Sequence, residues 1–124
     1  MEVLNKMKKG LVYDNQKYFS RFLKYEFEQE FDFNVCRNFD YFDQKLNDYS
    51  VIIFVIYSED EIFDFISVYK KGIPVIVCSF NKIILEKLKK MEDISVLDTS
   101  SLRSELIIEL RNFFNFSIPQ YVQK

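Results

Sequence analysis

The sequence predicts an α/β fold in which helices cover both faces of a parallel sheet. Two observations carry this prediction: continuous apolar, β-branched runs typical of fully buried strands, and apolar stripes of helical spacing between those runs. With 124 residues, 48% of them hydrophobic, the chain has the size of one domain with one core. We therefore expect a single domain over residues 1–124, with a core at about 8–116 and a short tail at 117–124.

The clearest strand signals lie in the middle of the chain. Residues 50–57 (SVIIFVIY) form one apolar run. Residues 73–78 (IPVIVC) form a second, with its proline near the strand start, where it removes no ladder hydrogen bond. Shorter strands are expected at 10–13, 33–36 and 94–97.

Helical spacing separates these strands. Apolar residues recur every three or four positions in five segments, and each such stripe would place one apolar face on the sheet: 19–27, 39–49, 62–69, 84–91 and 102–114. Residues 58–61 (SEDE) have the capping-box pattern, and Asn81 stands where a cap should precede the fourth helix. Five strands alternating with five helices predict a three-layer α/β/α sandwich with a five-stranded parallel sheet of order 2-1-3-4-5, the flavodoxin-like arrangement.

Composition excludes several enzyme classes. The chain has no His, so Ser-His and Cys-His nucleophilic pairs are impossible and the commonest zinc ligand is missing. Two Gly cannot supply a dinucleotide fingerprint or a P-loop. Carboxylate or Mg²⁺ chemistry remains, or no chemistry at all.

Charge and hydropathy bear on location and partners. The formal net charge is −2, without the basic excess of a nucleic-acid binder, and no apolar stretch approaches the ~20 residues of a membrane span. The first ten residues lack the apolar centre of a signal peptide. We expect a cytoplasmic protein that binds neither nucleic acid nor membrane, in which Cys36 and Cys78 are reduced, partly buried thiols.

Ligands of such a sheet bind beyond the carboxyl ends of its strands. Four short segments fall there: residues 14–15, 54–58, 79–81 and 98–100. These segments also carry a resemblance. Residues 11–16 (LVYDNQ), 48–54 (DYSVIIF), 72–79 (GIPVIVCS) and 97–100 (LDTS) resemble, in order and spacing, the strand ends of response-regulator receiver domains of two-component systems.

The resemblance implies a phosphorylation site, and the sequence departs from it. The family's acceptor carboxylate aligns with Phe54, its acidic pair with Asp14 and Asn15, and its Lys with Thr99; Ser79 alone keeps the family's hydroxyl. A phenyl ring can neither attack phosphorus nor ligate a metal, and one carboxylate beside one amide is a poor Mg²⁺ site. Asp14 is then either a turn or cap residue or a weak metal ligand, and Ser79 either a functional hydroxyl or one that flanks a helix.

We therefore predict a degenerate pseudo-receiver domain, with no enzymatic activity and no cofactor, that acts by protein–protein interaction. The resemblance implies a protein partner or a second copy, bound through the fourth helix (81–91), fifth strand (94–97) and fifth helix (101–115).

Two alternatives stay open. One is a phosphorylatable receiver with a displaced acceptor, Asp60 or Asp14. The other is a small flavodoxin-like protein that binds an aromatic or nucleotide ligand by stacking on Tyr13, Tyr57 and Phe80. For the chain as a whole, bound Mg²⁺ is possible but not expected.

Overall fold

Strands and helices alternate along the chain in the computed structural model, which describes residues 7–39, 48–69, 74–92 and 94–117. The strands are β1 (Lys8–Tyr13), β2 (Phe31–Cys36), β3 (Val51–Val55), β4 (Val75–Ser79) and β5 (Ser95–Asp98). The helices are α1 (Tyr18–Glu26), α3 (Glu61–Tyr69), α4 (Lys82–Lys89) and α5 (Arg103–Ser117). The helix expected at 39–49 falls largely on residues outside the described ranges, as do most of the tail and residues 1–6.

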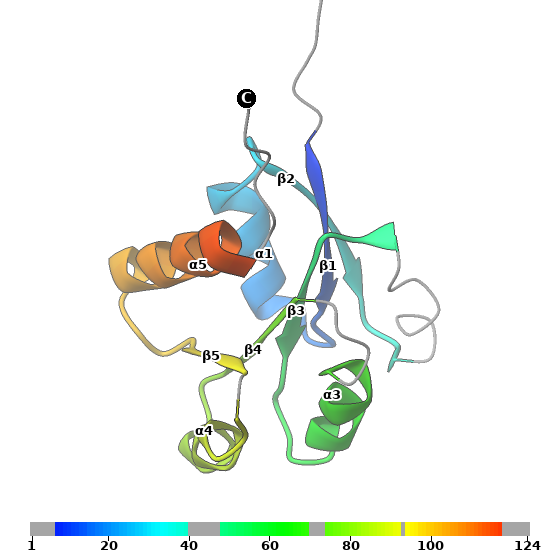
Figure 1. Ribbon diagram of the computed structural model, residues 1–124, viewed down its shortest axis with the longest axis vertical. Coiled ribbons are helices and arrows are strands. Elements are labelled where there is room, and N and C mark those ends of the chain that lie inside the picture. Colours follow the sequence, from blue (N-terminus) through cyan, green and yellow to red (C-terminus); the bar gives the residue numbers. More distant parts are fainter. Residues whose placement is uncertain (1–6, 40–47, 70–73, 93, 118–124) are drawn as a thin grey trace, which may run out of the picture.

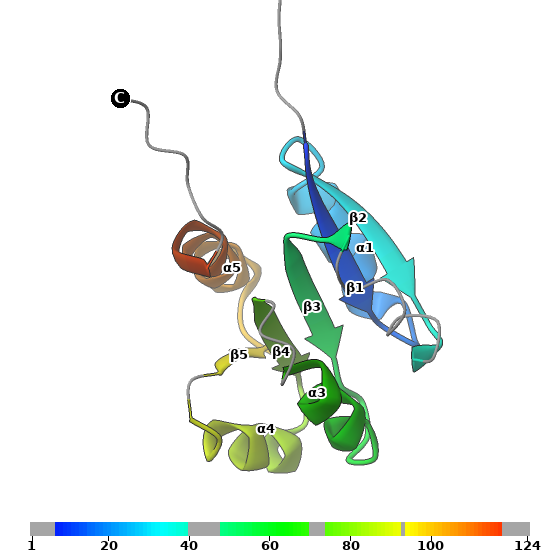
Figure 2. The same ribbon diagram turned by 45° about the vertical axis from the view of Figure 1, so that its right-hand side comes forward.

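All four strand pairings are parallel, and the strand order is β2-β1-β3-β4-β5. The predicted topology is therefore confirmed. Helices α1 and α5 cover one face of the sheet, and α3 and α4 cover the other (Figures 1 and 2). Strands β1, β3 and β4 lie inside the sheet, which explains why their sequences are continuous apolar runs rather than alternating ones.

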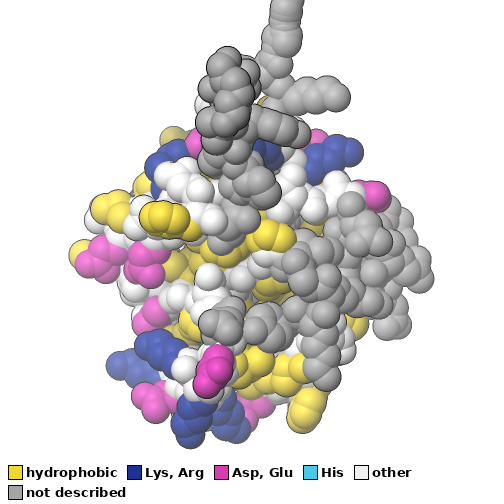
Figure 3. All heavy atoms as spheres, viewed as in Figure 1, with side chains coloured by type: hydrophobic (Ala, Val, Ile, Leu, Met, Phe, Trp, Pro, Cys, Tyr) yellow, Lys and Arg dark blue, Asp and Glu magenta, His cyan; other side chains and the backbone are white. Residues whose placement is uncertain are grey.

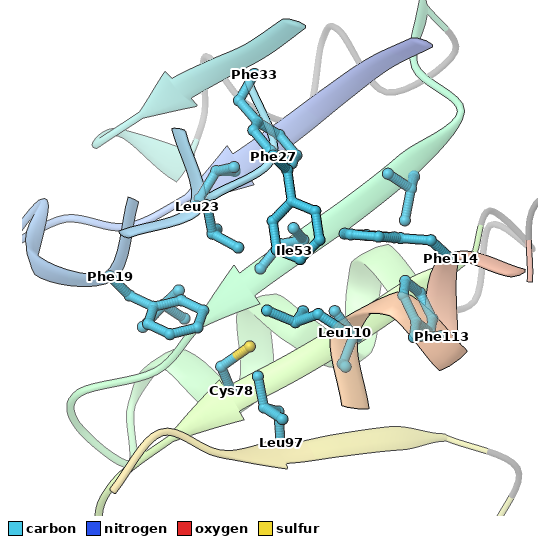
Figure 4. Close-up of a cluster of buried hydrophobic side chains, with 14 of the residues drawn as sticks. Phe19, Leu23, Phe27, Phe33, Ile53, Cys78, Leu97, Leu110, Phe113 and Phe114 are labelled. Carbon is cyan, nitrogen blue, oxygen red and sulfur yellow. The ribbon is translucent and has the colours of Figure 1, made fainter. Parts of the chain in front are cut away.

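The core has one cluster on each side of the sheet. On the α1 and α5 side, Phe27 and Phe114 meet edge to face with ring centroids 5.2 Å apart, and Cys78 lies in the same cluster beside Leu97 and Leu110 (Figure 4). On the other side, Phe65 of α3 packs against Phe54 of β3. Phenylalanine thus fills positions that smaller aliphatic side chains occupy in many cores, and each ring buries roughly 150–250 Å².

Gly10 lies directly against the ring of Phe33, which leaves no room for a side chain at this position. A Cβ atom at Gly10 would lie 2.6 Å from two ring carbons of Phe33, its partner on β2. Phe33 is itself stacked on Phe31, with ring centroids 5.0 Å apart. One of the two glycines of the chain therefore stands where a neighbouring side chain approaches the backbone closely.

The predicted caps are borne out in part. The Asn81 side chain accepts hydrogen bonds from the amides of Ile83 and Ile84, as an N-cap should. At α3, Glu61 returns to the Ser58 amide as the capping box requires, while its own amide donates to the Ser58 backbone carbonyl. Both cysteines are free, as expected, and they are buried rather than partly buried; burial raises the pKa of the Cys78 thiol.

Candidate functional site

The carboxyl ends of the four strands β1, β3, β4 and β5 meet at one edge of the sheet, because the strands are parallel and adjacent (Figure 2). The residues that the sequence analysis placed in a site follow these ends. Asp14 and Asn15 come after β1, Ser79 closes β4, and Thr99 comes after β5. Phe54 is the exception, since it lies within β3.

Asp14 is fully buried, and both of its carboxylate oxygens are used by the protein. Oδ1 accepts from the amides of Lys17 at 2.9 Å and Gln16 at 3.3 Å, and Oδ2 accepts from the amide of Ser20 at 2.9 Å. The hydroxyl of Tyr57 donates to Oδ1 at 2.6 Å. Four donors therefore surround one carboxylate, which sits where the positive end of the α1 dipole favours it.

This arrangement makes Asp14 the cap of α1. Lys17, the residue before the helix, forms no side-chain cap bond and has a left-handed backbone, with φ 62°. That conformation costs roughly 1–2 kcal/mol for a residue with a Cβ. The hydrogen bonds that the amides of Lys17 and Ser20 donate to Asp14 in this turn offset the strain. Of the two roles left open for Asp14, its contacts fit the turn or cap residue.

Tyr57 is tied to this carboxylate from the end of β3. Burial, followed by the hydrogen bond to Asp14, raises the pKa of the Tyr57 phenol. Residues 56 and 57 were expected to continue the strand. The Ile56 amide still bonds to the Cys78 carbonyl, but the Tyr57 amide turns away to Glu61 Oε1 at 2.8 Å, so the ladder stops.

A second buried carboxylate, Glu61, is the first residue of α3. Its Oε1 accepts from the amides of Tyr57 and Ser58, and its Oε2 accepts from Asn15 Nδ2 at 3.0 Å. Burial, together with the charge and hydrogen bond of Glu61, raises the pKa of Tyr13 to about 12. The Asn15 Oδ1 atom is buried without a hydrogen-bond partner. Asn15 thus completes a polar cluster with Glu61 and Tyr13 instead of forming an acidic pair with Asp14.

Sequence reasoning missed the place of Glu61 in this site. The capping-box pattern identified its helix-start role, but its contact with Asn15 joins residues 46 positions apart. Only the parallel pairing of β1 with β3 brings the two segments together. No local sequence signal could have revealed that contact.

Phe54 lies away from Asp14. Its fully buried ring stacks on Tyr13 with centroids 4.5 Å apart and packs against Phe65 on the α3 side of the sheet. The Asp14 carboxylate faces α1 on the opposite side. Phe54 is a core side chain, and Tyr57 rather than Phe54 contacts Asp14.

Ser79 and Thr99 lie where β4 and β5 end, at the same edge of the sheet. The buried Ser79 hydroxyl oxygen accepts from the Asn81 amide at 3.1 Å, just before α4, which fits the helix-flanking role. The Thr99 amide donates to the Ser79 carbonyl at 3.0 Å. Beside them the Ser100 hydroxyl donates to Asp98 Oδ1 and lowers the pKa of that carboxyl.

These residues do not fit a divalent cation. Within the described part of the chain, no group of three or more His, Cys, Asp or Glu side chains could hold a metal ion. Asp14, the one predicted metal ligand, accepts protein hydrogen bonds at both oxygens, whereas Mg²⁺ requires carboxylate oxygens that are available and a shell of water. A metal at this carboxylate would have to displace the cap of α1.

A hollow of about 320 Å³ opens at the same edge. Its walls are formed by side chains of α1 and of the three strand ends of β3, β4 and β5: Tyr18, Phe19, Val55, Tyr57, Phe80 and Thr99. Of the three aromatic residues expected to stack a ligand, Tyr57 and Phe80 come together here, with ring centroids 6.0 Å apart. Tyr13 does not line this hollow; it packs with Phe54 on the other side of the sheet.

No protein-family model matches the chain, and no curated protein matches it. Several solved structures do match the chain. The receiver domain of the Francisella response regulator 1452 is 26% identical, with a TM-score of 0.63 over 87% of this chain and 97% of that domain. The signal receiver domain of a putative LuxO repressor protein from Vibrio parahaemolyticus is 12% identical, with a TM-score of 0.66 over 90% and 93%.

A third similar structure is the N-terminal domain of a response regulator/sensory box/GGDEF three-domain protein from Carboxydothermus hydrogenoformans. It is 13% identical, with a TM-score of 0.64 over 87% of this chain and 94% of that domain. The chain therefore has the fold of response-regulator receiver domains, as its strand ends suggested. Among the described residues, no helix is long and apolar enough to cross a membrane.

Proposed function

We propose that this chain is a receiver-like signalling domain that takes no phosphoryl group at the family's usual position and acts by binding another protein. The receiver fold supports the signalling role. Phosphoryl transfer by such a domain needs a reactive carboxylate and a metal beside it, with a cation to neutralise the phosphoryl oxygens. The aligned positions carry Phe54, Asn15 and Thr99 instead.

The observation that carries the proposal is the state of Asp14. Both of its oxygens accept hydrogen bonds from protein donors, and the side chain has no exposed surface. A carboxylate held in this way stabilises the fold, and it is poorly placed to bind Mg²⁺ or to attack phosphorus.

The direct test is incubation of the whole chain with acetyl phosphate and Mg²⁺, followed by intact-mass measurement. We expect no phosphorylated species, while a receiver domain with an intact site, treated in parallel, gains one phosphate. A stoichiometric gain by this chain would refute the proposal.

A displaced acceptor is the second candidate, and the exposure of Asp60 favours it. Asp60 lies at the same edge of the sheet, in the connection between β3 and α3, and is exposed to solvent. If the chain does gain phosphate, Asp60→Asn should abolish the gain and Asp14→Asn should not, because Asp14 is buried. Loss of the gain only in Asp14→Asn would instead identify the buried carboxylate.

The proposed binding surface is the face formed by α4, β5 and α5. Lysines gather over α4 in Figure 3, and two apolar side chains of α5 are largely exposed, Ile108 (60%) and Phe116 (88%). A hollow of about 390 Å³ lies between Val96 of β5 and Phe116. Exposed apolar side chains beside charged residues are typical of protein interaction sites.

This surface is tested through the oligomeric state. Light scattering of the whole chain across a concentration series reports whether it binds a second copy. We expect Phe116→Ser to abolish any self-association and Phe63→Ser, a similarly exposed phenylalanine on α3, to leave it unchanged. Equal effects of the two substitutions would argue against a specific α4–β5–α5 interface.

A further inference from the structure

We propose that the hollow at the carboxyl edge of the sheet, with Tyr57 at its centre and Tyr18 and Phe80 on its sides, binds a small quaternary ammonium ion. This site is separate from the α4–β5–α5 surface and requires no phosphorylation. Binding of a ligand in this hollow can therefore be tested separately from the function proposed above.

The three rings are arranged as a partial cage. Tyr57 meets Tyr18 with centroids 6.4 Å apart and planes at 70°, and it meets Phe80 with centroids 6.0 Å apart and planes at 65°. Two steep walls thus flank a central ring, and all three rings line the hollow of about 320 Å³. A cation within about 6 Å of several ring faces is attracted by the quadrupole of each ring.

The solvent exposure of the Tyr18 and Phe80 side chains also favours a ligand in the hollow. Tyr18 is 71% exposed and Phe80 is 56% exposed, although both flank the same apolar depression. Exposed aromatic side chains grouped around one hollow are a feature of ligand-binding grooves. The hollow also lies where ligands bind in open α/β sheets, beyond the carboxyl ends of the strands.

The electrostatics of the central ring select a cation over a neutral aromatic ligand. The Tyr57 hydroxyl donates a hydrogen bond of 2.6 Å to the Asp14 carboxylate, which increases the electron density of the ring. None of the residues that line the hollow is basic. A cation placed against Tyr57 therefore meets an electron-rich face with a buried negative charge behind it, and no lining lysine or arginine repels it.

The polar groups of the hollow distinguish a quaternary from a primary ammonium ion. A primary ammonium is strongly hydrated and must replace its water with hydrogen-bond acceptors. Asp14 is fully buried and the Tyr57 hydroxyl donates to it, so the side-chain acceptors left in the lining are the two neutral hydroxyls of Tyr18 and Thr99. A quaternary ammonium has no N–H to satisfy, and its methyl groups pack against Phe19 and Val55 at the apolar side of the hollow.

The test compares choline with its uncharged isostere, 3,3-dimethylbutan-1-ol, in amide chemical-shift titrations of the whole chain. We expect choline to shift the amides of Tyr18, Tyr57 and Phe80 and to bind about three- to tenfold more tightly than the isostere, as a cation–ring attraction at a partly exposed site predicts. Equal affinity of the two compounds would show an apolar pocket without cation selectivity, and absence of saturable shifts would show no site. Either result overturns the proposal.

Two variants locate the site. Phe80→Leu keeps an apolar side chain but removes one wall, so choline affinity should fall about threefold or more while the isostere is little affected. Phe63→Leu, at another exposed phenylalanine, on α3, should change neither affinity. Both positions are on the surface, so both variants should keep the wild-type spectrum. Unchanged choline affinity in Phe80→Leu would contradict the cage.

Discussion

The hydroxyl of Tyr57 donates to Oδ1 of Asp14 across 2.6 Å and so links the ends of two strands that are adjacent in the sheet. Through this bond Asp14 connects β1, β3 and α1, because its other donors are the amides of Gln16 and Lys17 just before α1 and of Ser20 in its first turn. The residue that resembles part of a metal-binding acidic pair in sequence thus acts as a structural junction.

Removing the Tyr57 hydroxyl should measure the strength of this junction. Tyr57→Phe keeps the ring and leaves Oδ1 with one donor fewer, so we expect the free energy of unfolding to fall by about 1–2 kcal/mol. Urea denaturation monitored by circular dichroism provides the measurement. Tyr25→Phe, at an exposed tyrosine, should stay within about 0.5 kcal/mol of the wild type.

A double-mutant cycle separates the bond from other effects of the substitution. Asp14→Ala alone should cost more than Tyr57→Phe, because it also removes the cap of α1, which is worth about 0.5–2 kcal/mol. The double variant should cost less than the sum of the two single changes. Strict additivity would mean that the 2.6 Å contact contributes nothing.

The fold was predictable because its signals are local and repeated. Runs such as residues 51–55, buried on both faces, identify strands of a parallel sheet, and stripes such as residues 62–69 identify the helices between them. The crossover rule then leaves few strand orders. Even the cap at Asn81 follows from its position alone.

The site was only partly predictable, since its contacts join distant segments. Alignment along the sequence paired Phe54 with the family's acceptor, but the pleat of β3 directs that side chain to the α3 side, away from Asp14. Tyr57 and Glu61 lie 43 and 46 residues from their partners Asp14 and Asn15. A one-residue change in where β3 ends would rearrange both contacts, and periodicity does not fix strand ends that closely.

Placing a carboxylate at position 54 should not create an acceptor. Phe54 is fully buried between Tyr13 and Phe65, so Phe54→Ala should already cost about 3–5 kcal/mol. Phe54→Asp should cost clearly more, because it adds an unpaired charge to the same apolar space. Thermal unfolding ranks the two variants. A well-folded Phe54→Asp protein that gains phosphate from acetyl phosphate would show that position 54 can serve as the acceptor after all.

Gly10 should not tolerate a methyl group. In Gly10→Ala the new Cβ meets Phe33 ring carbons at 2.6 Å, and the ring is held by its stack on Phe31. Overpacking of this kind costs about 1–3 kcal/mol. The clash predicts a specific rescue: in a Phe33→Leu background, the same Gly10→Ala change should cost less. Equal costs in both backgrounds would assign the loss to the β1 backbone instead.

Alkaline pH should weaken the fold through the two buried phenols at the sheet edge. Burial and Glu61 raise the pKa of Tyr13 from 10.0 to about 12, and burial and Asp14 raise that of Tyr57. A pKa raised by folding means that the protonated phenol stabilises the folded state. This contribution is complete below about pH 10 and is lost as the pH rises through about 12.

The loss is measurable as a slope. For Tyr13 the free energy of unfolding should decrease by at most about 1.4 kcal/mol per pH unit between the two pKa values. Urea midpoints at several pH values above 9 give this slope, and Tyr13→Phe should reduce it, because phenylalanine has no proton to lose. Tyr25→Phe removes the hydroxyl of a largely exposed tyrosine and serves as the matched control variant. If Tyr13→Phe and the wild type lose stability in parallel above pH 10, the Tyr13 phenol is not held protonated by the fold.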